Sequence, residues 1–325
     1  MNMMFRARHV VRGGSIEEKI GMTLHIIFSS LAKSVRDFGG THVVVCLEGK
    51  SWRHSVYPQY KLARREMADE RSVLEKEEDA HFFEAFKEFT DFLTDQTNCT
   101  VLQHGRCEAD DFIARWIQNH PSDKHVIISS DSDFYQLINE NVSQYNGITG
   151  QHITHTGIFN DRGKPIIDKK TKQQKHIGDP EYILFEKCIR GDKTDGIFSA
   201  YPGARVKGSK NKVGIQEAFQ DRHRRGYEFN NFMLQRWTDH NDQEHVVLDD
   251  FKRNQLLIDL TMQPDDIKQC LDDTIMNAVQ KPHVTNVGIK FMKFCGRYDL
   301  ARLAQSPDQH AAYLNAKYIS INEST

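Results

Sequence analysis

Three short apolar runs, each followed closely by acidic side chains, constrain the fold more than any other feature of the sequence. The runs are 43–47, 101–102 and 126–128, and the acidic groups after them are Glu48, 108–111 and 131–133. The runs at 43–47 and 126–128 have the length of a strand, and we expect a shorter strand at 101–102. Apolar residues three to four apart predict a helix over 16–38, before the first run, and we expect another helix over 109–118, between the second and third runs. Alternating strands and helices predict an α/β fold with a mostly parallel sheet flanked by helices. The carboxyl ends of parallel strands share one edge, so the acids should meet there.

A fourth acidic group, Asp192 and Asp195, lies in a later segment, and its two carboxylates fall on one face if the segment is locally helical. A single acidic group of this kind is more often solvated surface than a metal site. Taken by itself, Asp111 is explained as a negative charge that the helix dipole favours at a helix N-terminus. Four groups brought to one edge would repel one another unless cations were present. Carboxylate oxygens prefer Mg²⁺ or Mn²⁺, so the sequence predicts hydrolytic phosphoryl transfer, with two ions.

Composition fits a packed globular protein of 325 residues, with 38% hydrophobic and 27% charged residues, which we expect to form two linked parts. The apolar runs are too short for a membrane span, and the N-terminal residues do not form a secretory signal. We therefore expect a cytoplasmic protein. The six cysteines form no C-x-x-C pair, which argues against a zinc ribbon or a disulfide framework.

Net charge is −2, so nucleic-acid binding is not indicated by the chain as a whole. Residues 190–225, however, carry nine Lys or Arg against four Asp or Glu, which is either a phosphate-binding face or ordinary solvated surface. From residue 180 the pattern is mainly helical. We place a boundary near 178, giving a first part of 1–178 and a helical second part of 179–325, and we assign no role to 146–176.

Several motifs resemble, in order and spacing, those of the 5′-nuclease (flap endonuclease) superfamily. Glu-Ala-Asp-Asp at 108–111, Ser-Ser-Asp-Ser-Asp at 129–133 and Gly-Asp-Lys-Thr-Asp at 191–195 resemble its downstream acidic motifs. Residues 57–64 resemble the base of its helical arch, through which a single-stranded 5′ end passes. Residues 253–265 are similar to bacteriophage members, most of all the ribonuclease H type of T-even phages. The likeness covers roughly residues 1–265.

The resemblance implies a PIN-like core with an arch at about 50–80, then a helical DNA-binding domain with a helix-three-turn-helix element. By position, the metal ligands would be Glu48, Glu108, Asp110, Asp111, Asp131, Asp133, Asp192 and Asp195. Lys61 and Arg64 would contact the scissile phosphate. Nucleic acid would be bound by Arg53, Tyr60, Arg65, Lys193, Arg205, Lys207, Lys210 and Lys212.

Three departures from the family pattern affect this transfer. Residues 1–7 resemble the segment just after the family's first strand, so that strand and its catalytic Asp are expected to be missing. The acid after the strand at 43–47 is Glu48, where most relatives have Asp. The glycine-rich hairpin is replaced by a longer and more basic segment, 200–214. We therefore do not carry over the potassium ion found there in relatives.

The resemblance implies a divalent-metal-dependent, structure-selective 5′ nuclease. Two alternatives to this function stay open. The chain would be a catalytically impaired DNA-binding protein if the first Asp is indispensable, or a PIN-type ribonuclease sharing the acidic sheet edge. The resemblance implies as substrates DNA with a 5′ flap or 5′ end and RNA–DNA hybrids, with a role in replication or repair. Relatives work with a sliding clamp and a single-strand-binding protein. A monomer is the default expectation.

Overall fold

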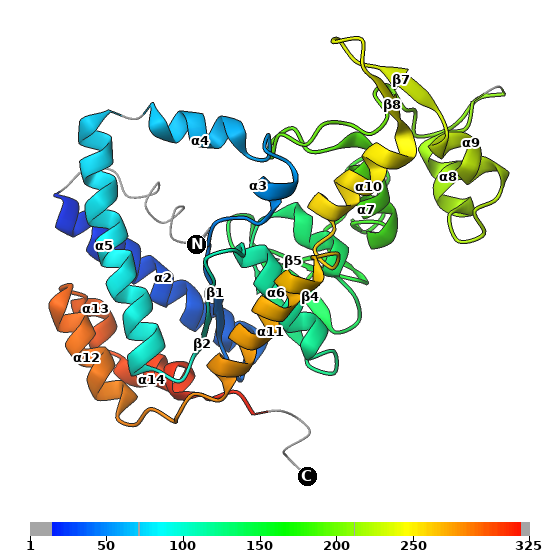
Figure 1. Cartoon of the computed structure of the whole chain (residues 1–325). Helices are drawn as coiled ribbons and strands as arrows, with labels where there is room; N and C mark the ends of the chain where they lie inside the picture. The colour runs from blue at the N-terminus through cyan, green and yellow to red at the C-terminus, as the bar shows by residue number, and fades with distance from the viewer. Residues whose placement is uncertain (1–14, 71, 211, 320–325) are drawn as a thin grey trace.

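A computed structural model describes residues 15–70, 72–210 and 212–319 (Figure 1). The prediction for residues 1–7 lies outside this range. Within it, none of the helices combines the length and the apolarity that crossing a bilayer requires.

The sheets confirm the α/β prediction, with parallel pairing where the acids were expected. Strand β1 (Val44–Cys46) pairs in parallel with β2 (Thr100–Leu102), and β3 (His125–Ile128) pairs in parallel with β4 (Val142–Asn146). Two antiparallel strands, β5 (Gln151–Thr154) and β6 (Gly157–Asn160), extend the second sheet from β4. Residues 146–176, to which no role was assigned, thus include a hairpin on the edge of this sheet.

Three helices surround these strands: α2 (Ile16–Phe38), α5 (Val73–Gln96) and α6 (Ala109–Asn119). Helix α2 begins with a capping box in which Ser15 and Glu18 satisfy each other's backbone N–H groups. It ends at Gly39, whose φ of 62° is the left-handed conformation that glycine adopts without a Cβ penalty. Ser72 and Glu75 form the same box at the start of α5.

The arch prediction corresponds to a helix standing off the body of the molecule. After the short α3 (Arg53–Val56), helix α4 (Leu62–Asp69) spans the distance to α5 at the top of Figure 1. Its side chains from Leu62 to Met67 are all exposed. The side chains from Leu62 to Met67 therefore gain little packing energy from the core.

The second part is a helical unit built on its own apolar cluster, which includes Phe185, Ile189, Ile215, Phe232 and Val247. Its elements are α7 (Pro180–Arg190), α8 (Ile215–Asp221), α9 (Tyr227–Met233), the antiparallel β7 (Arg236–Thr238) and β8 (Glu244–Val246), and α10 (Val247–Ile258).

The last four helices pack against the first part of the chain. The expected division into 1–178 and 179–325 had placed them in the second part. They are α11 (Asp265–Val279), α12 (Val287–Arg297), α13 (Ala301–Ala304) and α14 (Pro307–Asn315). Helix α11 packs against α6 and β2, whereas α12 and α14 pack against α5 and α2. The α/β core is therefore made from both ends of the described chain, and the helical unit is inserted at about 179–260.

Aromatic rings from these distant segments form the centre of that core. Phe28 of α2 is fully buried, and its ring centroid lies 5.3 Å from that of Phe89 and 5.1 Å from that of Phe291. Both contacts are edge-to-face, the geometry that the charge distribution of aromatic rings favours.

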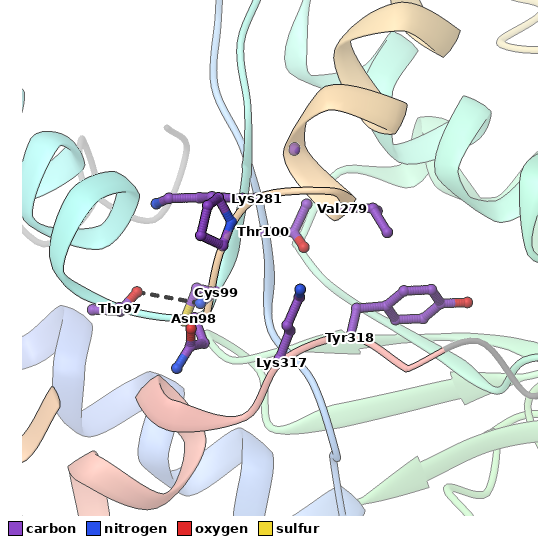
Figure 2. A pocket seen from close by; sticks show the side chains of 10 residues that line it. Thr97, Asn98, Cys99, Thr100, Val279, Lys281, Lys317 and Tyr318 are labelled. Carbon is purple, nitrogen blue, oxygen red and sulfur yellow. Dashed lines mark hydrogen bonds between the residues drawn. The ribbon is translucent and has the colours of Figure 1, made fainter. Parts of the chain in front are cut away.

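A small pocket lies near the start of β2, lined by residues including Thr97, Asn98, Lys281 and Lys317 (Figure 2). The acidic residues follow the other end of this strand. The pocket is therefore separate from the predicted site.

Replacing Phe28 with Ala should destabilise the protein by about 3–5 kcal/mol, because it removes a ring and leaves a cavity. Denaturant unfolding measures this loss. Met22→Ala on the same helix, where the side chain is 55% exposed, should stay within about 0.5 kcal/mol of wild type. Similar losses in the two variants would contradict the core described here.

Candidate active site

The loops after β1 and β2 are joined by backbone hydrogen bonds that bring their acids together. The N–H of Gly49 donates to Cys107 O at 2.9 Å, and the N–H of Lys50 donates to Gly105 O at 2.9 Å. A Cβ on residue 49 would lie 2.1 Å from His104 O, so only glycine permits this approach. Glu48 then accepts a hydrogen bond from the Ala109 N–H, which anchors it at the start of α6.

Glu108 is the most heavily paired carboxylate of the site. It accepts hydrogen bonds from Ser51 Oγ at 2.7 Å, Arg53 Nη1 at 2.9 Å, Tyr60 OH at 3.0 Å and Lys61 Nζ at 2.5 Å. Burial opposes its ionisation, but the charges of Lys61 and Arg53 outweigh burial and lower the pKa of Glu108 to about 2. This carboxylate is therefore ionised at any working pH.

Lys61 connects the first part to the acidic hairpin of the second part. Its Nζ lies 2.5 Å from Glu108 Oε1 and 3.8 Å from Asp195 Oδ2, and its backbone N–H donates to Asp195 O at 2.7 Å. Its φ of 52° is unusual for a residue with a side chain, and it precedes α4 directly. Arg64, one turn along, pairs with Asp195 Oδ1 at 2.9 Å and is 53% exposed. The structure thus places both predicted phosphate contacts at the acids.

Asp110 is close to two other carboxylates. Burial, with the nearby charges of Glu48 and Asp131, raises the pKa of Asp110 to about 8. Asp131 follows β3 and accepts the Asp133 N–H at 3.1 Å. Acids after three separate strands therefore act electrostatically on one another, as the strand-end rule predicted.

Lys187 also enters the site, and sequence reasoning did not include it. From α7 its Nζ pairs with Asp133 and lies 2.7 Å from Asp192 Oδ2. Burial raises the pKa of Asp133 despite this partner, whereas for Asp192 the ammonium outweighs burial and lowers the pKa. A lysine in the last turn of a helix is expected on helix-dipole grounds alone, so no sequence signal distinguished it.

Arg53, Tyr60 and Asp111 have interior positions that correct their expected roles. Arg53 is 2% exposed, with Nη2 donating to Asp111 Oδ1 at 2.8 Å and Nε donating to Leu257 O at 2.8 Å. Tyr60 is 3% exposed and donates to Glu108. Neither side chain is accessible to a phosphate. Asp111 is fully buried, and its oxygens accept from Arg53 and Trp52, so it holds Arg53 instead of an ion.

The remaining carboxylates supply the right donors for a divalent metal, since all are hard oxygen ligands. They are Glu48, Glu108, Asp110, Asp131, Asp133, Asp192 and Asp195. Across the described segments from 15 to 319, no three His, Cys, Asp or Glu side chains stand in an arrangement ready to hold an ion. Lys61 and Lys187 instead pair with four of these acids. Burial, with the charges of Glu48 and Asp131, raises the pKa of Asp110 although Lys61 acts against this shift.

The other residues predicted to bind nucleic acid lie on the surface. Arg65, Lys193, Arg205, Lys207, Lys210 and Lys212 are all exposed. The last four belong to the loop before α8, which is closed by a backbone bridge between Ser209 and Lys212. Glu217 Oε2 accepts the N–H groups of Gly208 and Gly214, each at 3.0 Å, and so holds this loop against α8. Four cations are thereby presented on an ordered loop.

An α/β core with an acidic strand edge, a bridging helix and an inserted helical unit defines the class of resolvase-like nucleases. Residues 1–164 match the family model described as the 5′-3′ exonuclease, N-terminal resolvase-like domain. The chain belongs to this 5′-3′ exonuclease family.

Curated relatives agree with this assignment. The chain is 28% identical over 192 residues to a 5′-3′ exonuclease of Mycoplasmopsis pulmonis, covering 58% of this chain and 56% of the relative. It is 27% identical over 276 residues to ribonuclease H of Enterobacteria phage T4, covering 77% and 76%. The match thus spans little more than half of the first relative and about three quarters of the second.

Solved structures share the fold. The D15 protein of phage T5, co-crystallised with metal ions, aligns with a TM-score of 0.55 at 18% identity, over 85% of this chain and 96% of that one. The same T5 flap endonuclease in a pseudo-enzyme-product complex with DNA and metal ions gives 0.53 at 20% identity, over 86% and 97%.

Arg53→Met should cost about 3–5 kcal/mol of stability, because it leaves Glu108 and Asp111 buried without their shared counter-ion. Chemical denaturation of the purified variant measures this. Arg64→Ala, which breaks a more exposed pair, should cost less than about 1 kcal/mol. Arg53 would instead be a phosphate contact if its replacement left stability intact and weakened DNA binding.

Asp110 should make the metal-free protein less stable as pH rises. Its folded pKa of about 8 lies above the ordinary value of 3.8, so the folded state favours the protonated form. The resulting stability is complete below about pH 4 and is lost as pH rises through about 8. In EDTA, the Tm of wild type should fall across this range and that of Asp110→Asn should fall less. Parallel profiles for the two proteins would exclude this assignment.

Proposed function

We propose that the chain is a divalent-metal-dependent, structure-selective 5′ nuclease that hydrolyses phosphodiester bonds in DNA bearing a 5′ flap or 5′ end, or in RNA–DNA hybrids. One observation supports this most strongly. Carboxylates from the ends of three strands and from the 191–195 hairpin are linked to one another: Lys61 pairs with Glu108 and Asp195, Lys187 pairs with Asp133 and Asp192, and the charges of Glu48 and Asp131 act on Asp110. Membership of the 5′-3′ exonuclease family agrees with this chemistry.

In this proposal Lys61 and Arg64 bind the non-bridging oxygens of the phosphate. The Lys61 ammonium is already held at the acids by Glu108 and Asp195, so little reorganisation is needed to meet the charge that develops during hydrolysis. Arg64 is more exposed and would guide the strand under α4. Arg53 and Asp111 position Glu108 through its hydrogen bonds without touching the substrate.

The carboxylates would hold Mg²⁺ or Mn²⁺, and we infer two ions from the number of acids. Glu48, Glu108, Asp110, Asp131 and Asp133 would be ligands, and Asp192 and Asp195 would complete the shell of the second ion. When bound, such ions supply an activated water and neutralise charge on the phosphate. A loaded site would also remove the carboxylate repulsion that raises the pKa of Asp110.

Duplex DNA would lie on the helical unit and the 5′ strand beneath α4. The exposed cations Lys193, Arg205, Lys207, Lys210 and Lys212 support phosphate contacts, which give little sequence preference and strong salt dependence. Relatives from bacteria and their phages support a role in replication or repair in a bacterial cytoplasm. Contacts with a sliding clamp and a single-strand-binding protein stay predictions.

Asp131→Asn should lower Mg²⁺-dependent cleavage of a 5′-labelled flap by more than about a hundredfold while DNA binding is kept, since even groups behind the ligands commonly matter 10–100-fold. Gel-resolved cleavage rates and a binding titration in EDTA measure the two effects. The matched control is Asp308→Asn in α14, which should cleave like wild type. A cleavage rate in Asp131→Asn equal to wild type would refute the metal site, and absence of cleavage by wild type would refute the nuclease.

A further inference from the structure

An exposed aromatic stack stands directly beside the acidic hairpin. Phe198 is 53% exposed, although its neighbours Ile197 and Ala200 are buried. Its ring stacks on Trp237 with centroids 5.7 Å apart and planes 26° apart, and Trp237 stacks on His245 at 4.3 Å and 10°. Because Trp237 covers one face of the Phe198 ring, the exposed surface lies on the other side. The stack is therefore open at one end.

Hydrogen bonds to the main chain hold both Trp237 and the backbone of Phe198 in place. Trp237 Nε1 donates to Ala200 O at 2.9 Å. The carbonyl of Phe198 accepts from Asn254 Nδ2 at 2.8 Å, and Asn254 is fully buried in α10. A flat ligand placed on Phe198 would thus meet a surface that is already ordered, which lowers the entropy cost of binding.

The hairpin keeps Phe198 close to the acids. Asp192 and Ile197 exchange backbone hydrogen bonds of 2.8 Å and 2.7 Å. Asp195 lies within this hairpin and meets Lys61 and Arg64. Phe198 follows Asp195 by three residues, so their Cα atoms are within about 11 Å of each other. A nucleotide next to the phosphate at the acids can reach the ring.

Two guanidinium groups contact the segment that carries Phe198. Arg253 Nη2 donates to Phe198 O at 3.3 Å, and its guanidinium lies 5.3 Å from the ring centroid of Tyr57, at the base of the arch. Arg64 adds a second, exposed guanidinium beside Asp195. Both guanidinium groups also pair with carboxylates, Arg253 with Asp250 and Arg64 with Asp195. An exposed aromatic ring with guanidinium groups on the same segment matches a nucleobase attached to a phosphate.

We propose that Phe198, backed by Trp237 and His245, is a stacking platform for an unpaired nucleobase of the substrate strand. This inference rests on the proposed function and adds a nucleotide-binding position to it. Every base has a π face, so the platform holds the strand without reading its sequence. Single exposed apolar side chains are ordinary, and Phe198 differs because it ends an ordered stack beside the acids.

The test compares wild type with Phe198→Leu, which keeps apolar cover over Trp237 but lacks a ring, and with Phe198→Tyr, which keeps the ring. Affinity for a 5′-flap DNA is measured in EDTA at one fixed salt concentration. Phe198→Leu should bind about tenfold more weakly and Phe198→Tyr like wild type. Ile289→Ala, an exposed apolar side chain on α12, is the control and should be unchanged.

Substrates carrying a single abasic site at successive positions make the test specific. At one position the missing base should weaken wild-type binding about tenfold and should not weaken Phe198→Leu further, because the two changes remove the same contact. The platform would be overturned if Phe198→Leu bound the flap as tightly as wild type. It would also be overturned if the substitution and the abasic site weakened binding independently at every position. The nuclease itself is judged separately, by wild-type cleavage of the intact flap in Mg²⁺.

Discussion

One buried arginine joins the parts of this molecule that must meet for a site to exist. Arg53 donates to Glu108 and Asp111 at the start of α6 and to the carbonyl of Leu257 at the end of α10. Two carboxylates this deeply buried are tolerated because they share one guanidinium whose planar donors fit both. The base of the arch, the acidic helix start and the inserted helical unit are therefore fixed relative to one another by charge as well as by packing.

Two neighbouring acids show how strongly surroundings control chemistry here. Glu108 has a pKa lowered to about 2 and Asp110 a pKa raised to about 8, although only one residue separates them. At Glu108 the charges of Lys61 and Arg53 outweigh burial, whereas at Asp110 burial and the charges of Glu48 and Asp131 outweigh Lys61. Opposite shifts in adjacent titratable groups are typical of functional sites. The basic residues thus favour the ionised form of Glu108, whereas the protonated form of Asp110 is favoured.

The parallel strands and the convergence of Glu48, Asp110 and Asp131 were predictable, because strand periodicity and the strand-end rule are local. The roles of Arg53 and Tyr60 were not, since a charged or phenolic side chain in a polar segment is usually exposed and no local pattern reveals burial. Lys187 was missed for a related reason: its partners Asp133 and Asp192 lie in other segments. The amphipathic helices after residue 262 were recognised as helices, but a periodic apolar face does not specify which surface it covers.

The return of helices α11 to α14 to the first part has a consequence for synthesis. Phe28 meets Phe291, and Asn98 bonds to residues near 284 and 315, so the nuclease core closes only after almost the whole chain has left the ribosome. The inserted helical unit, whose contacts are more local, can form earlier. The acidic edge is thus completed last, and a nascent or prematurely terminated chain has the inserted helical unit without a finished α/β core.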